Sequence, residues 1–189
     1  LIGVDYEVLP AIASTGAAHK PNAPQVWPDA PNNIWFAMDR GDKAATDAAF
    51  ARAAHVVSLK IVNNRLSANS MEGRTALAEF DPTSGKTTLH TSTQQPHKVR
   101  AGLAGAVFHE PEMKFRVVSP DVGGGFGMKG GVFPEDALVS WAARKTGRPV
   151  KWVAERMESI QSDCHGRDSV SDASLALDAS GKFIGLRVS

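Results

Sequence analysis

Hydrophobic and polar positions follow short periodic runs along the chain, and turn-forming residues separate the runs. Alternation with period two predicts strands over 55–62, 75–80, 87–92, 114–119, 149–153, 172–177 and 183–188. Helical spacing predicts helices over 42–54, 96–109 and 133–143, and Gly147 is expected to stop the last of them. This mixed order of elements predicts an α+β fold, with mixed sheets and helices on one face.

Two similar turns stand between predicted strands. The segments 81–86 (Asp-Pro-Thr-Ser-Gly-Lys) and 178–182 (Asp-Ala-Ser-Gly-Lys) both suit the loop of a hairpin. Two interpretations stay open. The turns indicate either a repeated strand-strand-helix-strand-helix-strand unit or only the general preference of Asp, Ser and Gly for surface turns.

Composition narrows the class of protein. Of the 189 residues 42% are hydrophobic and 22% are charged, which is typical of globular proteins. The net charge of +1 comes without a basic stripe, so neither nucleic acid nor an anionic membrane is an expected partner. No apolar run approaches the ~20 residues that span a bilayer. The start at Leu1 and the end inside a predicted strand indicate a piece of a longer polypeptide.

The cysteine and histidine residues of the sequence do not form a recognisable metal-binding pattern. The single cysteine, Cys164, cannot form an intrachain disulfide, a CxxC zinc site or a cysteine-held iron–sulfur cluster. We expect a structural or incidental cysteine there, although His165 beside it leaves open a metal thiolate or a nucleophile. The six histidines are scattered without ligand spacing, so a histidine-held metal is not expected. Any cofactor must be held by other groups.

The segment 123–131 is the most informative. Its six glycines free the backbone for positive φ and let N–H groups approach a ligand. Because it lies between a predicted strand and a predicted helix, one interpretation is a small phosphate- or dinucleotide-binding module. The match of 125–130 to G-x-G-x-x-G is weak, however, and no P-loop is present. Another interpretation is a structural domain whose glycines make a close-packed turn.

Two further polar segments are candidates. Gln94 stands where a predicted strand enters a helix, so its amide can line a polar pocket, unless Ser92 or Thr93 simply caps that helix. In 63–74, Glu72 and Arg74 could form a buried ion pair or line a site, but such charges usually lie solvated on a loop. The pattern favours a scaffold role for this second segment.

A family resemblance rests on several of these motifs, which are Ser92-Thr93-Gln94 with Pro96-His97, the segment 121–127 (Asp-Val-Gly-Gly-Gly-Phe-Gly), Glu135 with Ala137, and 147–152 (Gly-Arg-Pro-Val-Lys-Trp). They resemble the large, molybdopterin-binding subunit of the molybdenum hydroxylases, a family that includes xanthine dehydrogenase, aldehyde oxidase and aerobic carbon monoxide dehydrogenase. The segments 4–10 and 69–74 extend the resemblance over nearly the whole chain. It implies a fragment of an oxidoreductase subunit with the fold of a molybdenum-cofactor-binding domain.

The resemblance also implies a cofactor and site residues. The cofactor is molybdenum held through molybdopterin, with the cytosine dinucleotide form as one option, and no residue is assigned as a metal ligand. Gln94 and Phe126 are the implied catalytic positions, and the implied cofactor-binding positions are Gln94, Gly124, Gly125, Phe126 and Gly127. The Gln94 amide is expected beside an oxo ligand, the glycine N–H groups at the metal face and Phe126 beside the substrate. The implied reaction hydroxylates an aldehyde, N-heterocycle or CO-like molecule with water as oxygen source.

Partners and domains follow from the same resemblance. The implied partners are the remainder of the large subunit and separate iron–sulfur and FAD subunits, so those cofactors are not expected on this chain. The expected location is the cytoplasm, or the periplasm as in some family members. We expect 1–40 to be an extended arm or linker, 41–165 the first molybdopterin-binding unit and 166–189 the truncated start of a second repeat. The isolated fragment is expected to be inactive.

The sequence departs from the family pattern in informative places. Met128-Lys129 leads to Gly130-Gly131, where xanthine dehydrogenases continue into Lys-Glu, so a purine-contacting glutamate is missing and a purine substrate is not expected. Pro96-His97 and the segment 149–152 are closer to the carbon monoxide dehydrogenase branch. Any copper-binding cysteine loop and the family's general-base glutamate would follow Ser189. Gly73 stands where the family usually has proline.

Overall fold

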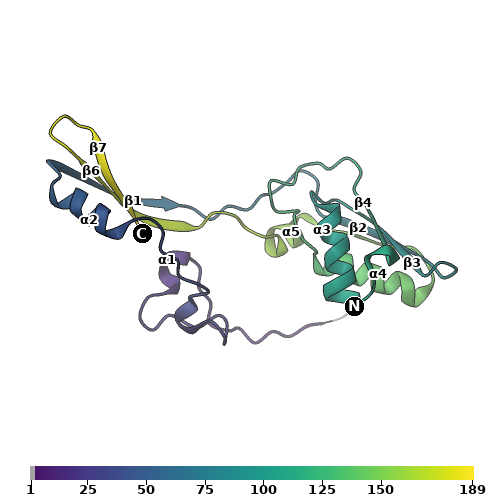
Figure 1. Cartoon of the computed structure of the whole chain (residues 1–189). Helices are drawn as coiled ribbons and strands as arrows, with labels where there is room; N and C mark the ends of the chain where they lie inside the picture. Colours follow the sequence, from purple (N-terminus) through teal and green to yellow (C-terminus); the bar gives the residue numbers. More distant parts are fainter. Residues whose placement is uncertain (1–2) are drawn as a thin grey trace. The chain divides into compact units, whose positions relative to one another are not determined.

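The computed structural model describes residues 3–189, so the first two residues of the expected arm lie outside the described part. The described chain divides into two compact units (Figure 1). One unit is formed by the chain up to Arg65 together with Arg167–Ser189, and the other by Leu66–Gly166. This grouping follows strand pairing, since a strand near residue 60 pairs with one near residue 170. The division into 1–40, 41–165 and 166–189 concerns family architecture and stays a prediction.

The unit Leu66–Gly166 is built on a four-stranded mixed sheet in the order β4-β3-β2-β5. Its strands are β2 (Thr75–Asp81), β3 (Lys86–Thr91), β4 (Phe115–Val118) and β5 (Val150–Val153). The pair β2–β3 is the expected hairpin, β5 is antiparallel to β2, and β4 is parallel to β3. Because parallel strands cannot be joined by a tight turn, helix α3 (Pro96–Gly102) lies in the β3–β4 connection.

Helices cover one face of this sheet, as the sequence predicts. Ala76 and Ala78 of β2 and Leu89 of β3 point to one side and are almost fully buried. Against them lie Val99 of α3 and Val139 of helix α4 (Pro134–Thr146). The small alanine side chains let α4 approach β2 closely, so the α+β class with helices on one face is confirmed.

Local signals set the ends of α4 as expected. Pro134 occupies the first turn, where its missing N–H has no cost, and Glu135 and Asp136 stand at the positive end of the helix dipole. Gly147 ends the helix with a φ of +64°, and its N–H donates to the carbonyl of Ala143. Such a left-handed C-terminal residue is most easily glycine.

The helix expected over 96–109 differs from the prediction. It is α-helical only over Pro96–Gly102 and continues as a π-helical segment, η2 (Leu103–Phe108), which ends at His109 with a φ of +54°. Gly102 and Gly105 lower the preference for a regular α-helix where the turn widens. A short 3-10 turn, η3 (Glu112–Lys114), then leads into β4.

The other unit contains a three-stranded antiparallel sheet in the order β1-β6-β7. Its strands are β1 (His55–Asn63), β6 (Ser169–Leu177) and β7 (Phe183–Val188), and the predicted hairpin joins β6 to β7. Helix α2 (Lys43–Ala51) lies on β7, where Gly185 leaves room for Ala49 and Phe50. Since β6 pairs with β1, the order strand-strand-helix-strand-helix-strand occurs once, in β2–β5, and a second copy stays a prediction.

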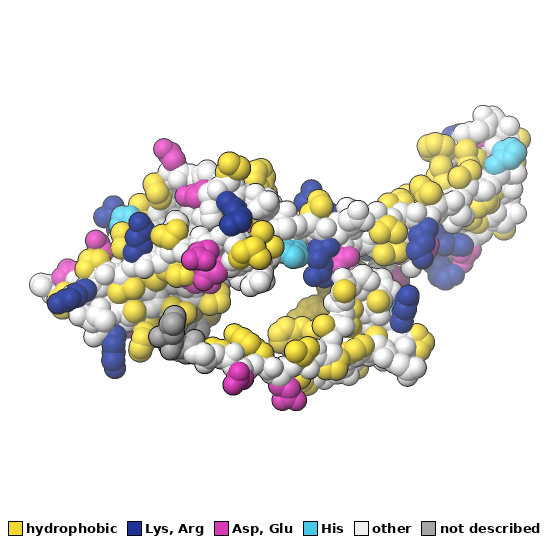
Figure 2. All heavy atoms as spheres, turned by 180° about the vertical axis from the view of Figure 1, so that it is seen from behind, with side chains coloured by type: hydrophobic (Ala, Val, Ile, Leu, Met, Phe, Trp, Pro, Cys, Tyr) yellow, Lys and Arg dark blue, Asp and Glu magenta, His cyan; other side chains and the backbone are white. Residues whose placement is uncertain are grey.

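Figure 2 shows that hydrophobic side chains are exposed over much of the surface in that view, and the face of this sheet opposite α2 also carries exposed apolar side chains. Three of them are Val57 and Leu59 of β1 and Leu186 of β7, which are 60%, 62% and 62% exposed. The face therefore has no covering layer among the described residues.

Two expectations need correction. The first 35 residues do not all run extended, because the chain forms two short helical turns, α1 (Thr15–Ala18) and η1 (Pro31–Asn33), the second begun by a proline in its first position. Helix α5 (Arg156–Ser162) was not predicted. It begins at Glu155, whose N–H donates to Glu158 in a capping box that uses glutamate rather than the more usual serine or threonine.

Candidate functional site

Gln94 and the glycine-rich turn meet within the unit Leu66–Gly166. The backbone N–H of Gly127 donates to Oε1 of Gln94 at 3.0 Å. The backbone N–H of Gln94 donates to the carbonyl oxygen of Lys129 at 2.8 Å. The two segments that the sequence singles out therefore lie against each other, although 33 positions separate Gln94 from Gly127.

The end of β3 holds Gln94 through buried hydroxyl groups. Oγ of Ser92 accepts from the backbone N–H of Thr75 at 3.2 Å, and Oγ1 of Thr93 donates to the Lys129 carbonyl at 3.1 Å. Helix α3 has no side-chain cap, although Oγ1 of Thr93 also accepts from the backbone N–H of its N-cap residue, Gln95, at 3.2 Å. Gln94, unlike its two predecessors, is exposed.

The glycines of the turn are required by its geometry at specific places. Gly124 and Gly127 have φ values of +97° and +87°, which side chains disfavour. A Cβ on Gly125 would lie 2.5 Å from Cδ of Gln94, so only glycine allows the amide to approach. Phe126 has a φ of +51° and a side chain that is 72% exposed, an unusual conformation for a bulky residue.

Three hydrogen-bond donors at this contact have no partner among residues 3–189. They are the side-chain amide Nε2 of Gln94 and the backbone N–H groups of Gly125 and Phe126. Donors grouped in this way, next to a turn without side chains, suit an oxo group or another anionic oxygen. The donor set thus fits the oxygen face of a molybdenum cofactor, and these residues would hold it.

Sequence reasoning assigned Glu72 to the scaffold and gave Lys129 no role, yet both contact the turn. The Lys129 side chain is fully buried, and its Nζ lies 2.9 Å from Oε2 and 2.9 Å from the carbonyl oxygen of Glu72. The same Oε2 accepts from the backbone N–H of Gly123 at 2.8 Å. The sequence held no signal for this contact, because a lysine in a loop is normally solvated.

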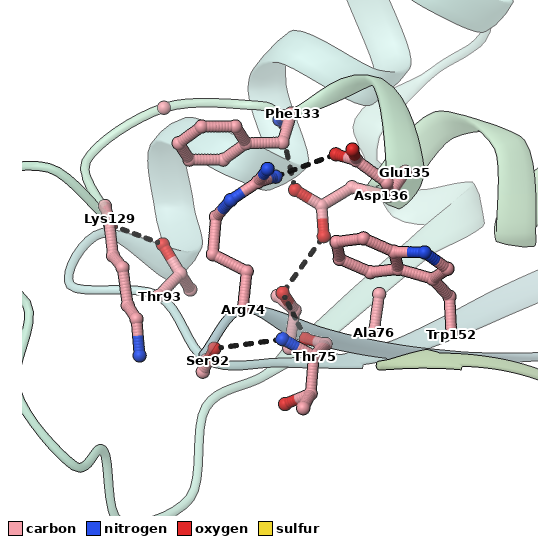
Figure 3. A pocket seen from close by; sticks show the side chains of 12 residues that line it. Arg74, Thr75, Ala76, Ser92, Thr93, Lys129, Phe133, Glu135, Asp136 and Trp152 are labelled. Atoms are coloured by element: carbon pink, nitrogen blue, oxygen red, sulfur yellow. Dashed lines mark hydrogen bonds and ion pairs between the residues drawn. The ribbon is translucent and has the colours of Figure 1, made fainter. Parts of the chain in front are cut away.

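Arg74 is the centre of a buried polar cluster beside the site (Figure 3). It donates to Glu135 at 2.6 Å, to Asp163 at 2.7 Å and to Ser162 at 2.7 Å, and its guanidinium lies 4.0 Å from the centre of the Phe133 ring. Burial alone lowers the pKa of Arg74, but the bonds to Glu135 and Asp163 outweigh burial and raise it above its ordinary value. The pair expected as one alternative, Glu72 with Arg74, is therefore not formed.

Asp136 connects α4 to the end of β3. Its Oδ1 accepts from Oγ1 of Thr91 at 2.8 Å and its Oδ2 accepts from the backbone N–H of Phe133 at 3.0 Å (Figure 3). Burial raises the pKa of Asp136, although the bonds from Phe133 and Thr91 act in the other direction. The carboxyl group thereby holds the strand that leads into Gln94.

The start of α4 does not suit a phosphate. Glu135 and Asp136 bring two carboxyl groups to its first turn, and Asp136 already occupies the N–H of Phe133. A phosphate at a helix N-terminus needs free N–H groups and no competing negative charge. The interpretation as a phosphate- or dinucleotide-binding module gains no support from this geometry.

Other candidates contribute no further site. Cys164 is exposed, and within residues 3–189 no three His, Cys, Asp or Glu side chains come together as metal ligands. None of the helices in the described part has the length and apolar character needed to cross a membrane.

Residues 26–189 match the family model of the molybdopterin cofactor-binding domain, and the chain belongs to that family. This confirms the resemblance drawn from the sequence motifs.

Relatives of known function span the chain. It is 38% identical to the carbon monoxide dehydrogenase large chain of Hydrogenophaga pseudoflava, over 99% of this chain and 25% of that protein. It is 35% identical to the 6-hydroxypseudooxynicotine dehydrogenase complex subunit gamma of Paenarthrobacter nicotinovorans, over 99% of this chain and 23% of that protein. Both are oxidoreductases, and this chain spans about a quarter of their length.

Solved structures agree in fold. The reconstituted CO dehydrogenase from Oligotropha carboxidovorans superposes with a TM-score of 0.86 at 32% identity, over 98% of this chain and 24% of that chain. The aldehyde oxidoreductase from Desulfovibrio gigas gives a TM-score of 0.77 at 27% identity, over 96% of this chain and 20% of that one. The fold class is thus that of the molybdenum hydroxylases.

Proposed function

We propose that this chain forms one wall of the active site of a molybdenum hydroxylase large subunit. In this proposal the amide of Gln94 donates to an oxygen ligand of the cofactor, and Gly124, Gly125, Phe126 and Gly127 line its face. One observation carries the proposal, which is the contact between Gln94 and Gly127 with free donors beside it. The bound group in this proposal is molybdopterin, with the cytosine dinucleotide form as one option that the family resemblance implies.

When bound, the cofactor supplies the two-electron oxidising centre. Overall, the C–H of an aldehyde or N-heterocycle and water become C–OH, whereas CO and water become CO2; either reaction releases two electrons and two protons. The residues of this chain contribute donors that are already oriented, and groups fixed before reaction do not have to reorganise in the transition state. The catalytic base and the rest of the cofactor cradle come from residues outside this chain, so the isolated chain is expected to be inactive.

The turn also bears on the substrate. Phe126 is exposed beside the free donors, where an apolar ring can contact a small molecule. Met128 and Lys129, which follow Gly127, are both buried, and Lys129 is bound to Glu72. Neither residue is an acid, so this part of the turn has no carboxyl group to contact a purine. We therefore propose an aldehyde, an N-heterocycle other than a purine, or a CO-like molecule.

We propose further that the electrons pass to iron–sulfur and FAD subunits, because one relative is named as a subunit of a dehydrogenase complex and another as the large subunit of a hydroxylase. The remainder of the large subunit is the other partner. A cytoplasmic location and the division into arm, first unit and second repeat complete the proposal.

The test uses the full-length subunit that carries this segment, purified with its partner subunits. We expect stoichiometric molybdenum and pterin, and dye-linked oxidation of a member of the proposed substrate classes. Gln94→Ala should lower kcat by about 100-fold, the size of a lost oxyanion donor, with molybdenum still bound. Gln95→Ala is the matched control, since Gln95 is a neighbouring exposed glutamine. Unchanged turnover of Gln94→Ala, with full molybdenum content, would overturn the assignment.

A further inference from the structure

The ion pair between the fully buried Lys129 and the half-buried Glu72 lies beside the glycine turn and has no established role. The Lys129 side chain has an exposed fraction of 0%, so it cannot contact a substrate directly. A buried ammonium group is costly unless it is paired and hydrogen-bonded. Glu72 meets both needs, with its carboxylate and its carbonyl oxygen each 2.9 Å from Nζ.

Glu72 joins the two ends of the turn. At the first end, its Oε2 accepts from the N–H of Gly123 at 2.8 Å and its own N–H donates to the Gly123 carbonyl at 3.2 Å. At the second end, it binds the side chain of Lys129. One residue from a distant loop thus clamps both the entry and the exit of the glycine turn.

Lys129 connects that clamp to Gln94. Its carbonyl oxygen accepts from the N–H of Gln94 at 2.8 Å and from Oγ1 of Thr93 at 3.1 Å. A shift of Lys129 must therefore move both the turn and the strand end that carries the amide. Together with the bond from the Gly127 N–H to Oε1 of Gln94, Lys129 therefore helps to set the distance between the free donors of Gln94 and those of Gly125.

We propose that Glu72 and Lys129 are positioning residues, whose ion pair fixes the glycine turn against Gln94 and so sets the geometry of the cofactor-facing donors. The inference rests on the function proposed above. If the pair were merely structural, its loss would destabilise the whole unit equally. If the pair positions the turn, its loss must first increase the mobility of the glycine turn.

The experiment uses the full-length subunit in cofactor-free and loaded forms. The principal variant combines Glu72→Ala with Lys129→Met, which removes both charges and leaves no unpaired ion in the interior. The companion variant combines Glu72→Gln with Lys129→Met and returns an acceptor to the N–H of Gly123. Glu79→Gln, on an exposed residue of β2, is the control.

The first measurement is hydrogen exchange over 122–131 in the cofactor-free subunit. We expect the principal variant to exchange about tenfold faster there, as for loss of a hydrogen bond in a closed turn, while 75–91 matches the wild type. The companion variant should recover most of the protection. Equal protection of 122–131 in wild type and principal variant would overturn the inference.

The second measurement is steady-state kinetics of the loaded enzyme. The principal variant should lower kcat by about tenfold or more, with KM within about twofold, since a displaced donor affects the reacting geometry rather than substrate contact. Unchanged kcat would also overturn the inference. If the wild type binds no molybdopterin, the proposed function fails, and the exchange measurement still decides whether the pair fixes the turn.

Discussion

Arg74 and Asp163 lie 89 positions apart in the sequence and form a buried ion pair, with 2.7 Å between Nε and Oδ1. Their side chains are only 5% and 3% exposed. The pair holds the residue that follows α5 against the start of β2, close to the Gln94 site. Ion pairs of this kind add little beyond a well-packed apolar core, but losing one partner is costly because the other charge stays buried.

Arg74→Met is therefore expected to destabilise the unit Leu66–Gly166 by about 3–5 kcal/mol. Methionine keeps the apolar contact with Phe133 but leaves the carboxylate of Asp163 without a counter-charge. Native-state hydrogen exchange of the β2 amides in the full-length subunit measures the loss. Arg116→Met is the control, since Arg116 is exposed on β4 and should cost no more than about 0.5 kcal/mol. Equal losses in the two variants would show that burial of the pair is unimportant.

A pH dependence follows from Asp136, whose pKa is raised by burial above its ordinary value of 3.8. Between 3.8 and the raised value, the folded state holds a proton that the unfolded state has lost, so stability falls as pH rises. Asp136→Asn lacks this titration. Wild type should therefore lose stability relative to Asp136→Asn as the pH rises above about 4, as measured by Tm. A relative stability that grows over this range would contradict the assignment.

Gly125→Ala separates site geometry from stability. Its new Cβ would meet the flexible end of Gln94, which can move, so we expect a change in unfolding free energy below about 1 kcal/mol. The displaced amide loses its bond from Gly127, and kcat should fall by about 10- to 100-fold. Gly131→Ala is the matched control, because no atom lies within 4 Å of its added Cβ. Equal kcat for the two variants would remove the steric argument.

Local chemistry made much of the fold predictable. Asp81 with Gly85, and Pro134 with Gly147, act on their own neighbours, so the hairpin and helix α4 can be read from a few adjacent residues. The meeting of Gln94 with the glycine turn was anticipated through motif resemblance, not through spacing. The donors left free at that contact, however, become visible only when every hydrogen bond has been assigned.

The parts that escaped prediction depend on distant partners. A lysine in a loop, such as Lys129, is expected to be solvated. Only the fold brings its Nζ to 2.9 Å from Oε2 of Glu72, which lies 57 positions away in the sequence. In the same way, Arg74 forms ion pairs with the distant Glu135 and Asp163 and not with Glu72, which is close to it in the sequence. Helix α5 is short and begins at a glutamate, so its capping signal was weaker than the usual one.

The double attachment of Lys129 has a consequence for which changes the turn can accept. Its side chain is bound on one side and its carbonyl on the other, while Gly123 is bound to the same carboxylate. A residue inserted or deleted between Gly123 and Lys129 would break one attachment whatever its chemical nature. Relatives that keep this clamp are therefore expected to keep the length of the turn.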